Sequence, residues 1–315
     1  MIASRALRSA VLALSAASLA GSASAQDEAS CALELVVLGA GQDAGAPQIG
    51  HADDAGPRLL PSSLGVIDRD AGARYLFDAT PAITEQLAML DRIAPPGDGL
   101  GLDGIFLTHA HIGHYLGLAW LGREAANARG VPVFAMPRMA QFLRENGPWS
   151  QLVELDNITL MPLADQELIP LSDSFGLWPI AVPHRDEYSE TVGFLLMSAG
   201  KRALYVPDID SWAEFEEAGG ATLPELLAKV DYAFLDATFW DDGELTGRDM
   251  SAIPHPRVRR TMDALAGLPE AERGKLNFIH YNHTNPIRDP ASAQSREVIA
   301  RGFHVARGGD RHCLD

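Results

Sequence analysis

The sequence Thr108-His109-Ala110-His111-Ile112-Gly113-His114 follows a short apolar run, Gly104-Ile105-Phe106-Leu107. Three histidines therefore fall within six positions at the end of a predicted buried strand. Neutral imidazole is the commonest metal ligand, and three such ligands with an open position are typical of a catalytic zinc site. A loop of surface histidines is the alternative, and it is the usual interpretation of a lone His. The H-x-H-x-x-H spacing directly after a strand favours the metal.

Three other predicted strands also end in a histidine or an aspartate. His184 follows the strand 177–182, Asp208 follows the strand 203–206, and His280 ends the strand 276–279. Sites are commonly built from loops at strand ends, because the sheet holds those loops rigidly. Taken singly, each of these residues fits a solvated loop. Together with the histidine cluster, the four strand ends predict one shared site.

The chain alternates short apolar runs with amphipathic segments. We predict strands at residues 33–38, 64–67, 75–77, 105–107, 131–134, 158–161, 177–182, 192–197, 203–206, 232–235 and 276–279. The predicted helices are residues 83–93, 116–128, 138–145, 223–229 and 258–265. Two strand-rich halves, each with helices outside, suggest an α/β fold, a four-layer αββα sandwich.

This ordered set of ligand-type residues resembles the metallo-β-lactamase fold superfamily. In that superfamily an H-x-H-x-D-H loop, a later His, a later Asp and a final His surround one or two metal ions. The resemblance implies that His109, His111 and His184 hold a first metal. It implies a second metal on His114 and His280, with Asp208 as the bridging carboxylate.

The resemblance is closer to the branch that contains the coenzyme PQQ synthesis protein B. The matching segments run in the same order across nearly the whole mature chain, at residues 38–48, 236–240, 243–250 and 278–286. One departure is Gly113, which stands where the superfamily has an aspartate that binds the second metal. The candidates to compensate for this loss are His283, Asp43 and Asp186.

A second departure concerns residues 49–53, which contain no cysteine. The synthesis protein carries a Cys-rich segment in this early part of its chain. The difference argues against a direct role in PQQ assembly. The amino-terminal leader argues the same way, because cofactor assembly is expected in the cytoplasm.

The chemistry of such a site can be stated from the residues. A zinc ion held by His109, His111 and His184 would lower the pKa of its bound water to roughly 7, which makes hydroxide available at neutral pH. Asp208 would orient or bridge the nucleophile, and Asp43 is a candidate proton acceptor. We name four candidate substrate-binding residues, although packing or surface roles are the alternative for each: His51, His255, Tyr281 and His283.

The amino-terminal segment has the pattern of a secretory signal peptide. Arg5 and Arg8 precede an apolar run at residues 10–20, and Ala23-Ser24-Ala25 supplies the small residues of a cleavage site. The run is shorter than the roughly 20 residues that a spanning helix needs. We therefore expect cleavage near Ala25, a single domain over residues 26–315, no stable membrane insertion, and a periplasmic or secreted protein.

The charge of the chain limits the classes of partner, and its cysteines allow one disulfide. The formal net charge is −17, which disfavours nucleic acid and anionic membrane surfaces and leaves a small-molecule substrate. The chain has two cysteines, Cys31 and Cys313, near the two ends of the mature protein. In an oxidising compartment these two residues could pair, if the fold brings them together.

We carry three functional hypotheses. The first is an exported metal-dependent hydrolase that uses one or two zinc ions on an ester, lactone, amide or phosphodiester. The second is an iron-dependent oxygenase-type enzyme, as in the PQQ branch. The third is a non-catalytic metal- or ligand-binding protein, because Gly113 could mark a disabled site. Fold resemblance alone assigns no substrate, and the sequence gives no oligomeric state.

Overall fold

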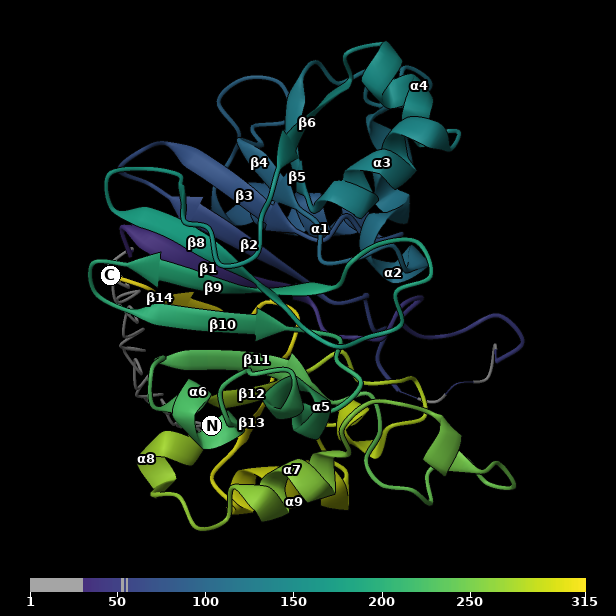
Figure 1. The fold of residues 1–315 in the computed structure, drawn as a ribbon, viewed down its shortest axis with the longest axis vertical. Coiled ribbons are helices and arrows are strands. Elements are labelled where there is room, and N and C mark those ends of the chain that lie inside the picture. Colours follow the sequence, from purple (N-terminus) through teal and green to yellow (C-terminus); the bar gives the residue numbers. More distant parts are fainter. Residues whose placement is uncertain (1–30, 52–53, 55) are drawn as a thin grey trace, which may run out of the picture. The chain divides into compact units, whose positions relative to one another are not determined.

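Two seven-stranded sheets form the centre of the molecule (Figure 1). The computed structural model describes residues 31–51, 54 and 56–315, so the predicted signal peptide lies outside the described residues. The first sheet contains, in chain order, β1 Leu33–Gly39, β2 Ser63–Asp68, β3 Ala73–Phe77, β4 Gly104–Phe106, β5 Val131–Ala135, β6 Ile158–Pro162 and β14 Arg311–Cys313. The second contains β7 Ile169–Pro170, β8 Phe175–Ala181, β9 Val192–Ser198, β10 Arg202–Val206, β11 Tyr232–Asp236, β12 Leu276–Ile279 and β13 His304–Val305.

Helices cover the outer face of each sheet (Figure 1). The first sheet is covered by α1 Ile83–Ile93, α2 Ile112–Tyr115, α3 Pro137–Glu145 and α4 Trp149–Glu154. The second is covered by α5 Trp212–Glu217, α6 Leu223–Leu227, α7 Val258–Ala264, α8 Glu270–Arg273 and α9 Ala293–Ala300. The predicted αββα sandwich is confirmed.

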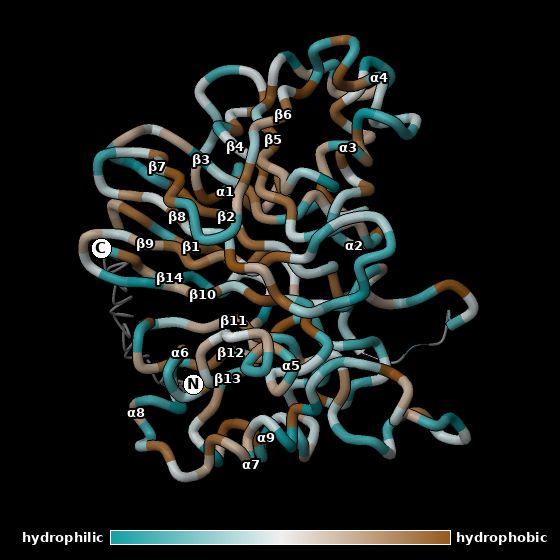
Figure 2. Tube along the Cα trace, in the orientation of Figure 1, coloured by the Kyte–Doolittle hydropathy of each residue, from teal (hydrophilic) through white to brown (hydrophobic). Residues whose placement is uncertain are grey.

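Alternation along the strands explains the layers. On β1, Leu35 and Val37 pack into the interior between the sheets, whereas Val36 and Leu38 pack against the helices. Successive side chains of a strand point to opposite faces, so a strand covered on both faces is apolar throughout. Figure 2 shows this as hydrophobic colour along the strands. Each fully buried aliphatic or aromatic side chain contributes about 1.5–3 kcal/mol to folding.

The sheets bring the carboxyl ends of several strands to one region. Strands β3 to β6 run parallel, and β10 to β13 run parallel in the second sheet. Parallel neighbours end on the same edge, so the loops that follow them gather there. This arrangement places the histidine loop after β4 close to the loops after β10 and β12.

The two ends of the described chain are joined. Cys31 and Cys313 form a disulfide with their Cα atoms 5.4 Å apart, and β14 pairs antiparallel with β1. The pairing of the two cysteines that we considered from the sequence is therefore present. Among the described residues, the longest apolar helices all fall short of what a bilayer crossing requires.

The predicted helix at residues 116–128 is wrong in extent. The structure has a 3₁₀ helix, η1 Leu116–Leu121, followed by turns. Gly117 packs against the loop after β3 so closely that a Cβ there would lie 2.1 Å from the carbonyl oxygen of Thr80. Gly122 then takes an extended conformation and ends the helix. Tertiary packing and a glycine thus override the apolar periodicity.

Candidate metal centre

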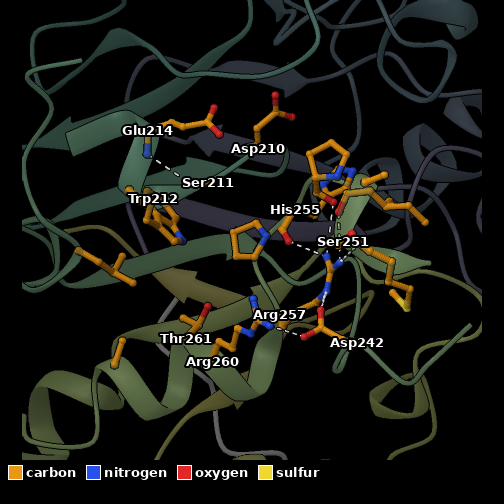
Figure 3. A pocket seen from close by; sticks show the side chains of 18 of the residues that line it. Asp210, Ser211, Trp212, Glu214, Asp242, Ser251, His255, Arg257, Arg260 and Thr261 are labelled. Carbon is orange, nitrogen blue, oxygen red and sulfur yellow. Dashed lines mark hydrogen bonds and ion pairs between the residues drawn. The ribbon is translucent and has the colours of Figure 1, made fainter. Parts of the chain in front are cut away.

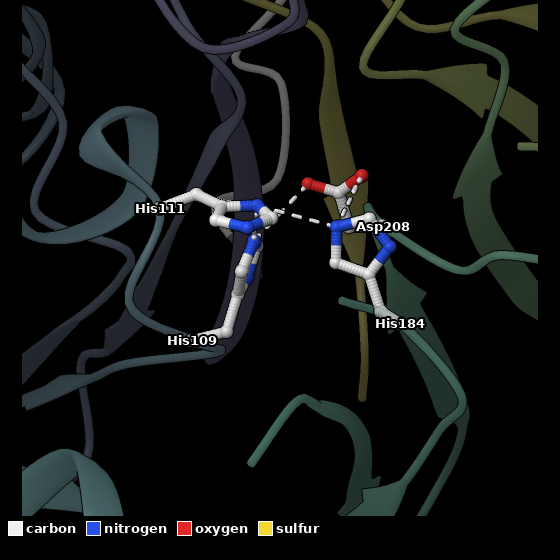
Figure 4. Close-up of side chains that lie close together, drawn as sticks. All are labelled: His109, His111, His184 and Asp208. Carbon is white, nitrogen blue, oxygen red and sulfur yellow. Dashed lines mark hydrogen bonds and ion pairs between the residues drawn. The ribbon is translucent and has the colours of Figure 1, made fainter. Parts of the chain in front are cut away.

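The histidine loop after β4 turns its imidazoles toward one point. His109 is 1 % exposed, and its Nε2 lies 2.8 Å from Nδ1 of His111. His184, in the loop after β8, places its Nε2 3.2 Å from the same His111 nitrogen. Figure 4 shows the three rings meeting beside Asp208. Three ring nitrogens from two loops therefore converge as the sequence predicts.

Asp208 lies between this group and a second one. Its Oδ2 is 3.4 Å from Nε2 of His109 and 3.2 Å from Nε2 of both His114 and His280. The ligand atoms form two clusters in which all members lie within 4.8 Å of one another, His109-His111-His184-Asp208 and His114-Asp208-His280. One buried carboxylate thus belongs to both clusters.

These separations suit a metal ion. Zinc–nitrogen bonds of about 2.0–2.1 Å in a tetrahedron place ligand nitrogens about 3.3 Å apart, close to the 3.2 Å between His184 and His111. The Nε2 atoms of His114 and His280 are buried and make no hydrogen bond with any described residue. Buried polar atoms normally have a partner. The donor chemistry, imidazole with carboxylate, fits zinc or another transition metal.

The remaining ring nitrogens are held by neighbours. Asp78 Oδ2 lies 2.8 Å from Nδ1 of His114, and Asp210 Oδ1 lies 2.7 Å from Nδ1 of His184. Thr108 Oγ1 lies 3.0 Å from Nδ1 of His109, and Thr238 Oγ1 lies 3.1 Å from Nδ1 of His280. Partners of this kind fix the orientation of the ring and expose the other nitrogen to a metal.

For most of these side chains, the pKa shift favours the protonation state that can bind a metal. Burial lowers the pKa of His109 and His280, and it lowers the pKa of His111 to about 4, so all three rings are neutral near pH 7. Burial opposes ionisation of Asp208, but the imidazoles around it, first His280, hold the pKa of this carboxyl well below its usual range. Neutral imidazoles and an ionised carboxylate are what metal binding requires.

His114 differs from the other rings. Burial lowers its pKa, yet the adjacent carboxylates of Asp78 and Asp208 outweigh that effect and raise the pKa well above its usual value. A cation is therefore favoured between these two acids. A metal ion at Nε2 would replace the proton in that role.

His255 was predicted to contact the substrate, and the structure places it beside Asp208. Its Nδ1 lies 2.8 Å from Asp236 Oδ2 and 3.3 Å from Asp208 Oδ1. Burial lowers the pKa of His255, but the carboxylates, first Asp236, raise it to about 9. A protonated His255 thus forms ion pairs with both Asp236 and Asp208. From the sequence we expected Asp236 to belong to a loop over the cleft and to have no chemical role, although it ends β11 as the ligand-type residues end other strands.

Asp78 was also missed. It is fully buried and directly follows β3, and it accepts hydrogen bonds from the backbone N–H and hydroxyl of Thr108, each at 2.9 Å. The sequence does contain a signal for it, because Asp78 is an acidic residue immediately after an apolar strand. The same pattern led us to Asp208.

A cavity of about 530 Å³ is lined by three of the other predicted residues, Asp43, His51 and His283. The rings of His51 and His283 pack with their centroids 4.8 Å apart. Tyr281 does not join them. It is 1 % exposed, and its hydroxyl donates to the carbonyl of Ala306 at 3.1 Å, so this predicted substrate contact is a core residue.

A larger cavity, about 940 Å³, lies beside α5 and α7 (Figure 3). Asp210, beside His184, and His255, beside Asp208, line it together with Trp212 and Arg257. Arg257 is engaged by Asp242 at 2.9 Å and is not free to bind a ligand. The two cavities share Arg248 and Ile253 in their walls, so they adjoin each other.

The sequence is similar to those of known proteins. Residues 73–281 match the family model described as a beta-lactamase superfamily domain. The chain is 30% identical over 264 residues to the coenzyme PQQ synthesis protein B of Methylobacillus flagellatus, across 74% of this chain and 81% of that protein.

Two solved structures show a similar fold. The Zn²⁺-bound PqqB from Methylobacterium extorquens has a TM-score of 0.72 at 21% identity, covering 89% of this chain and 100% of that one. A diphosphatase from the PhnP family has a TM-score of 0.61 at 22% identity, covering 89% and 96%. The family resemblance predicted from the sequence is confirmed. The chain belongs to the beta-lactamase superfamily and, within it, to the family of the coenzyme PQQ synthesis protein B.

Proposed function

We propose that this protein is an exported metal-dependent hydrolase that acts on an ester, lactone, amide or phosphodiester of a small molecule. The observation that carries the proposal is the pair of ligand clusters that share Asp208. Five imidazoles around one buried carboxylate are costly to assemble without an ion, because desolvated polar groups then lack partners.

The position of each residue in the site determines the role that we assign to it. His109, His111 and His184 would hold the first metal, and His114 and His280 would hold the second, with Asp208 shared by the two clusters. When bound, zinc lowers the pKa of a water ligand toward roughly 7 and polarises a carbonyl or phosphoryl oxygen. Asp208 lies where it can contact both ions. Asp43, on the wall of the adjoining cavity, is placed to take up a proton.

The adjoining cavity suits a small substrate. Its volume of about 530 Å³ lies within the range of small-molecule sites, roughly 300–1,000 Å³. His51 and His283 line it, and both can donate hydrogen bonds to an oxygen-rich group. We assign these two residues to substrate binding. One solved relative is a diphosphatase from the PhnP family, and this likeness supports hydrolysis as the reaction class.

Export is part of the proposal. The leader at residues 1–25 carries the signal-peptide pattern, and a disulfide joins Cys31 to Cys313. Such bonds persist in oxidising compartments and are rare in the cytosol. We place the protein in the periplasm or outside the cell. Mass spectrometry of the protein recovered from its native compartment should give a mature amino terminus near Gln26.

The first experiment measures the metal content of the protein purified without added metal, and then its hydrolysis of a panel of chromogenic esters, lactones, amides and phosphodiesters. The variant His109→Ala/His111→Ala should lose metal and hydrolysis together. His304→Ala is the matched control, because that histidine is exposed and remote on β13. Hydrolysis that survives in the double variant would contradict the proposal. Iron content with dioxygen consumption, and no hydrolysis, would favour the oxygenase.

A further inference from the structure

The missing carboxylate at position 113 has a structural explanation. Gly113 lies in α2, and a Cβ added to it would lie 2.4 Å from the Cα of Asp43 and 2.8 Å from its Oδ1. The nearest of these atoms belongs to the backbone, which cannot swing aside as a flexible side chain can. An aspartate at position 113 therefore has no room in this fold. The place where its side chain would begin is occupied by Asp43.

The turn that carries Asp43 is anchored next to His280. Tyr281 donates its backbone N–H to the carbonyl of Ala40 at 3.0 Å, and Gln42 donates to the carbonyl of Tyr281 at 3.1 Å. Asp43 itself takes a left-handed conformation with φ of 38°. These bonds fix the position of the turn relative to the second ligand cluster, and they hold Asp43 in a conformation that an unconstrained chain would avoid.

The side chain of Asp43 lies beside Gly113, the residue that precedes His114. Its Oδ1 is buried and makes no hydrogen bond with any described residue. A buried carboxylate oxygen without a donor is costly unless a cation is near. The unpartnered oxygen, which lies beside the residue that precedes His114, therefore points to a cation at the second ligand cluster.

The other two candidates to replace the carboxylate are engaged elsewhere. Asp186 is exposed and lies 3.1 Å from a guanidinium nitrogen of Arg138. His283 Nδ1 lies 3.0 Å from Asp54.

We propose that Asp43 supplies the carboxylate of the second metal position, and that Gly113 is glycine because the Asp43 turn occupies the adjacent space. In this chain the carboxylate thus comes from the turn after β1, and not from the histidine loop. This inference rests on the metal centre of the proposed function and deepens it.

The test titrates zinc into the metal-depleted protein by calorimetry and counts equivalents, with Co²⁺ absorption as a second readout. Wild type should bind two equivalents. Asp43→Asn and Asp43→Ser should bind one tightly, with the second weakened at least tenfold. Gly113→Ala should have the same effect, because the added methyl group displaces the turn. The double variant Asp43→Asn/Gly113→Ala should be no worse than either single variant, since both remove one contribution.

Matched controls are Asp186→Asn, another carboxylate near the site loops, and Gly267→Ala, where a Cβ meets nothing within 4 Å. Both should keep two equivalents. Thermal melting of each variant, with the far-ultraviolet spectrum, verifies that it is folded. Two tight equivalents in both Asp43 variants would overturn the inference, as would a single equivalent in wild type. A one-metal wild type that still hydrolyses would refute the inference while leaving the proposed function intact.

Discussion

The carboxylate of Asp78 lies 2.8 Å from Nδ1 of His114, and both side chains are fully buried. Asp78 also accepts from Thr108 and from the hydroxyl of Tyr205, the latter at 3.2 Å. One acid therefore sets the ring orientation of a proposed metal ligand and joins the two sheets, because Thr108 follows β4 and Tyr205 lies on β10. Its loss should affect both metal affinity and stability.

Asp78→Asn should weaken zinc binding about 10–100-fold, the usual cost of losing a partner to a metal-bound His. The amide removes the negative charge that holds the His114 ring as a ligand. A competition titration against a chromophoric chelator measures the change. Asp68→Asn, a buried acid of the same sheet outside the ligand clusters, is the control. Unchanged affinity in Asp78→Asn would contradict the role given to Asp78.

Glu244 should make folding stability depend on pH. Burial raises its pKa to about 7 from an ordinary 4.5, despite hydrogen bonds from the Trp240 N–H and the Thr284 hydroxyl. Because this carboxyl ionises more easily in the unfolded chain, its contribution is fully present below about pH 4.5 and is lost as the pH rises through 7. Glu244→Gln should therefore stabilise the protein at pH 8, by up to about 3 kcal/mol.

The same substitution should have little effect on stability near pH 4.5. Urea unfolding at the two pH values measures the difference. Glu216→Gln, an exposed acid on α5, should shift stability by less than about 0.5 kcal/mol at both. Equal stabilisation by Glu244→Gln at both pH values would show that ionisation is not the cause.

Reduction of the disulfide should destabilise the fold. Cys31 and Cys313 are separated by 282 positions, and a bridge across so long a loop contributes up to about 5 kcal/mol, chiefly by restricting the unfolded chain. Urea unfolding with and without reductant should show the loss. The variant Cys31→Ser/Cys313→Ser should match the reduced protein and should not respond to reductant. A midpoint that is the same in all samples would contradict this prediction.

The loss of stability on metal removal should be restored by zinc and not by magnesium. Five of the six ligand side chains offer imidazole nitrogen, which zinc and other transition metals prefer, whereas Mg²⁺ and Ca²⁺ prefer oxygen. Chelation should lower the melting temperature, because an ion that binds only the folded state stabilises it. Added Zn²⁺ should restore the melting temperature, and Mg²⁺ at the same concentration should not. Full recovery with Mg²⁺ would contradict the ligand assignment.

The sequence predicted the six clustered residues because each follows a strand, and strand ends can be read from short apolar runs. The element bounds were recovered to within a few residues for most predicted strands, and for helix α1 in full. Elements with weak apolar patterns, such as α9 and the two-residue strands β7 and β13, were not predicted. Their formation depends on pairing and packing across the fold, which local periodicity does not report.

Residue roles were harder to predict than residue positions. Tyr281 and His283 are two positions apart in one loop, yet the first enters the core and the second lines the cavity. The relation between Asp43 and Gly113 was equally out of reach, since 70 positions separate two residues whose atoms compete for the same space. The sequence could name Asp43 as a candidate, but the steric reason appears in three dimensions alone.

The hydrogen bonds between the two ends of the described chain have a practical consequence. The backbone N–H groups of Ala32 and Leu33 both donate to the carboxylate of Asp315, so these ends lie within hydrogen-bond distance of each other. A circular permutant that joins residue 315 to residue 31 through a short linker should therefore fold. New termini at the exposed turn of residues 97–99 would leave the ligand loops unbroken. Such a permutant would show that the order in which the strands are synthesised is not needed to assemble the metal centre.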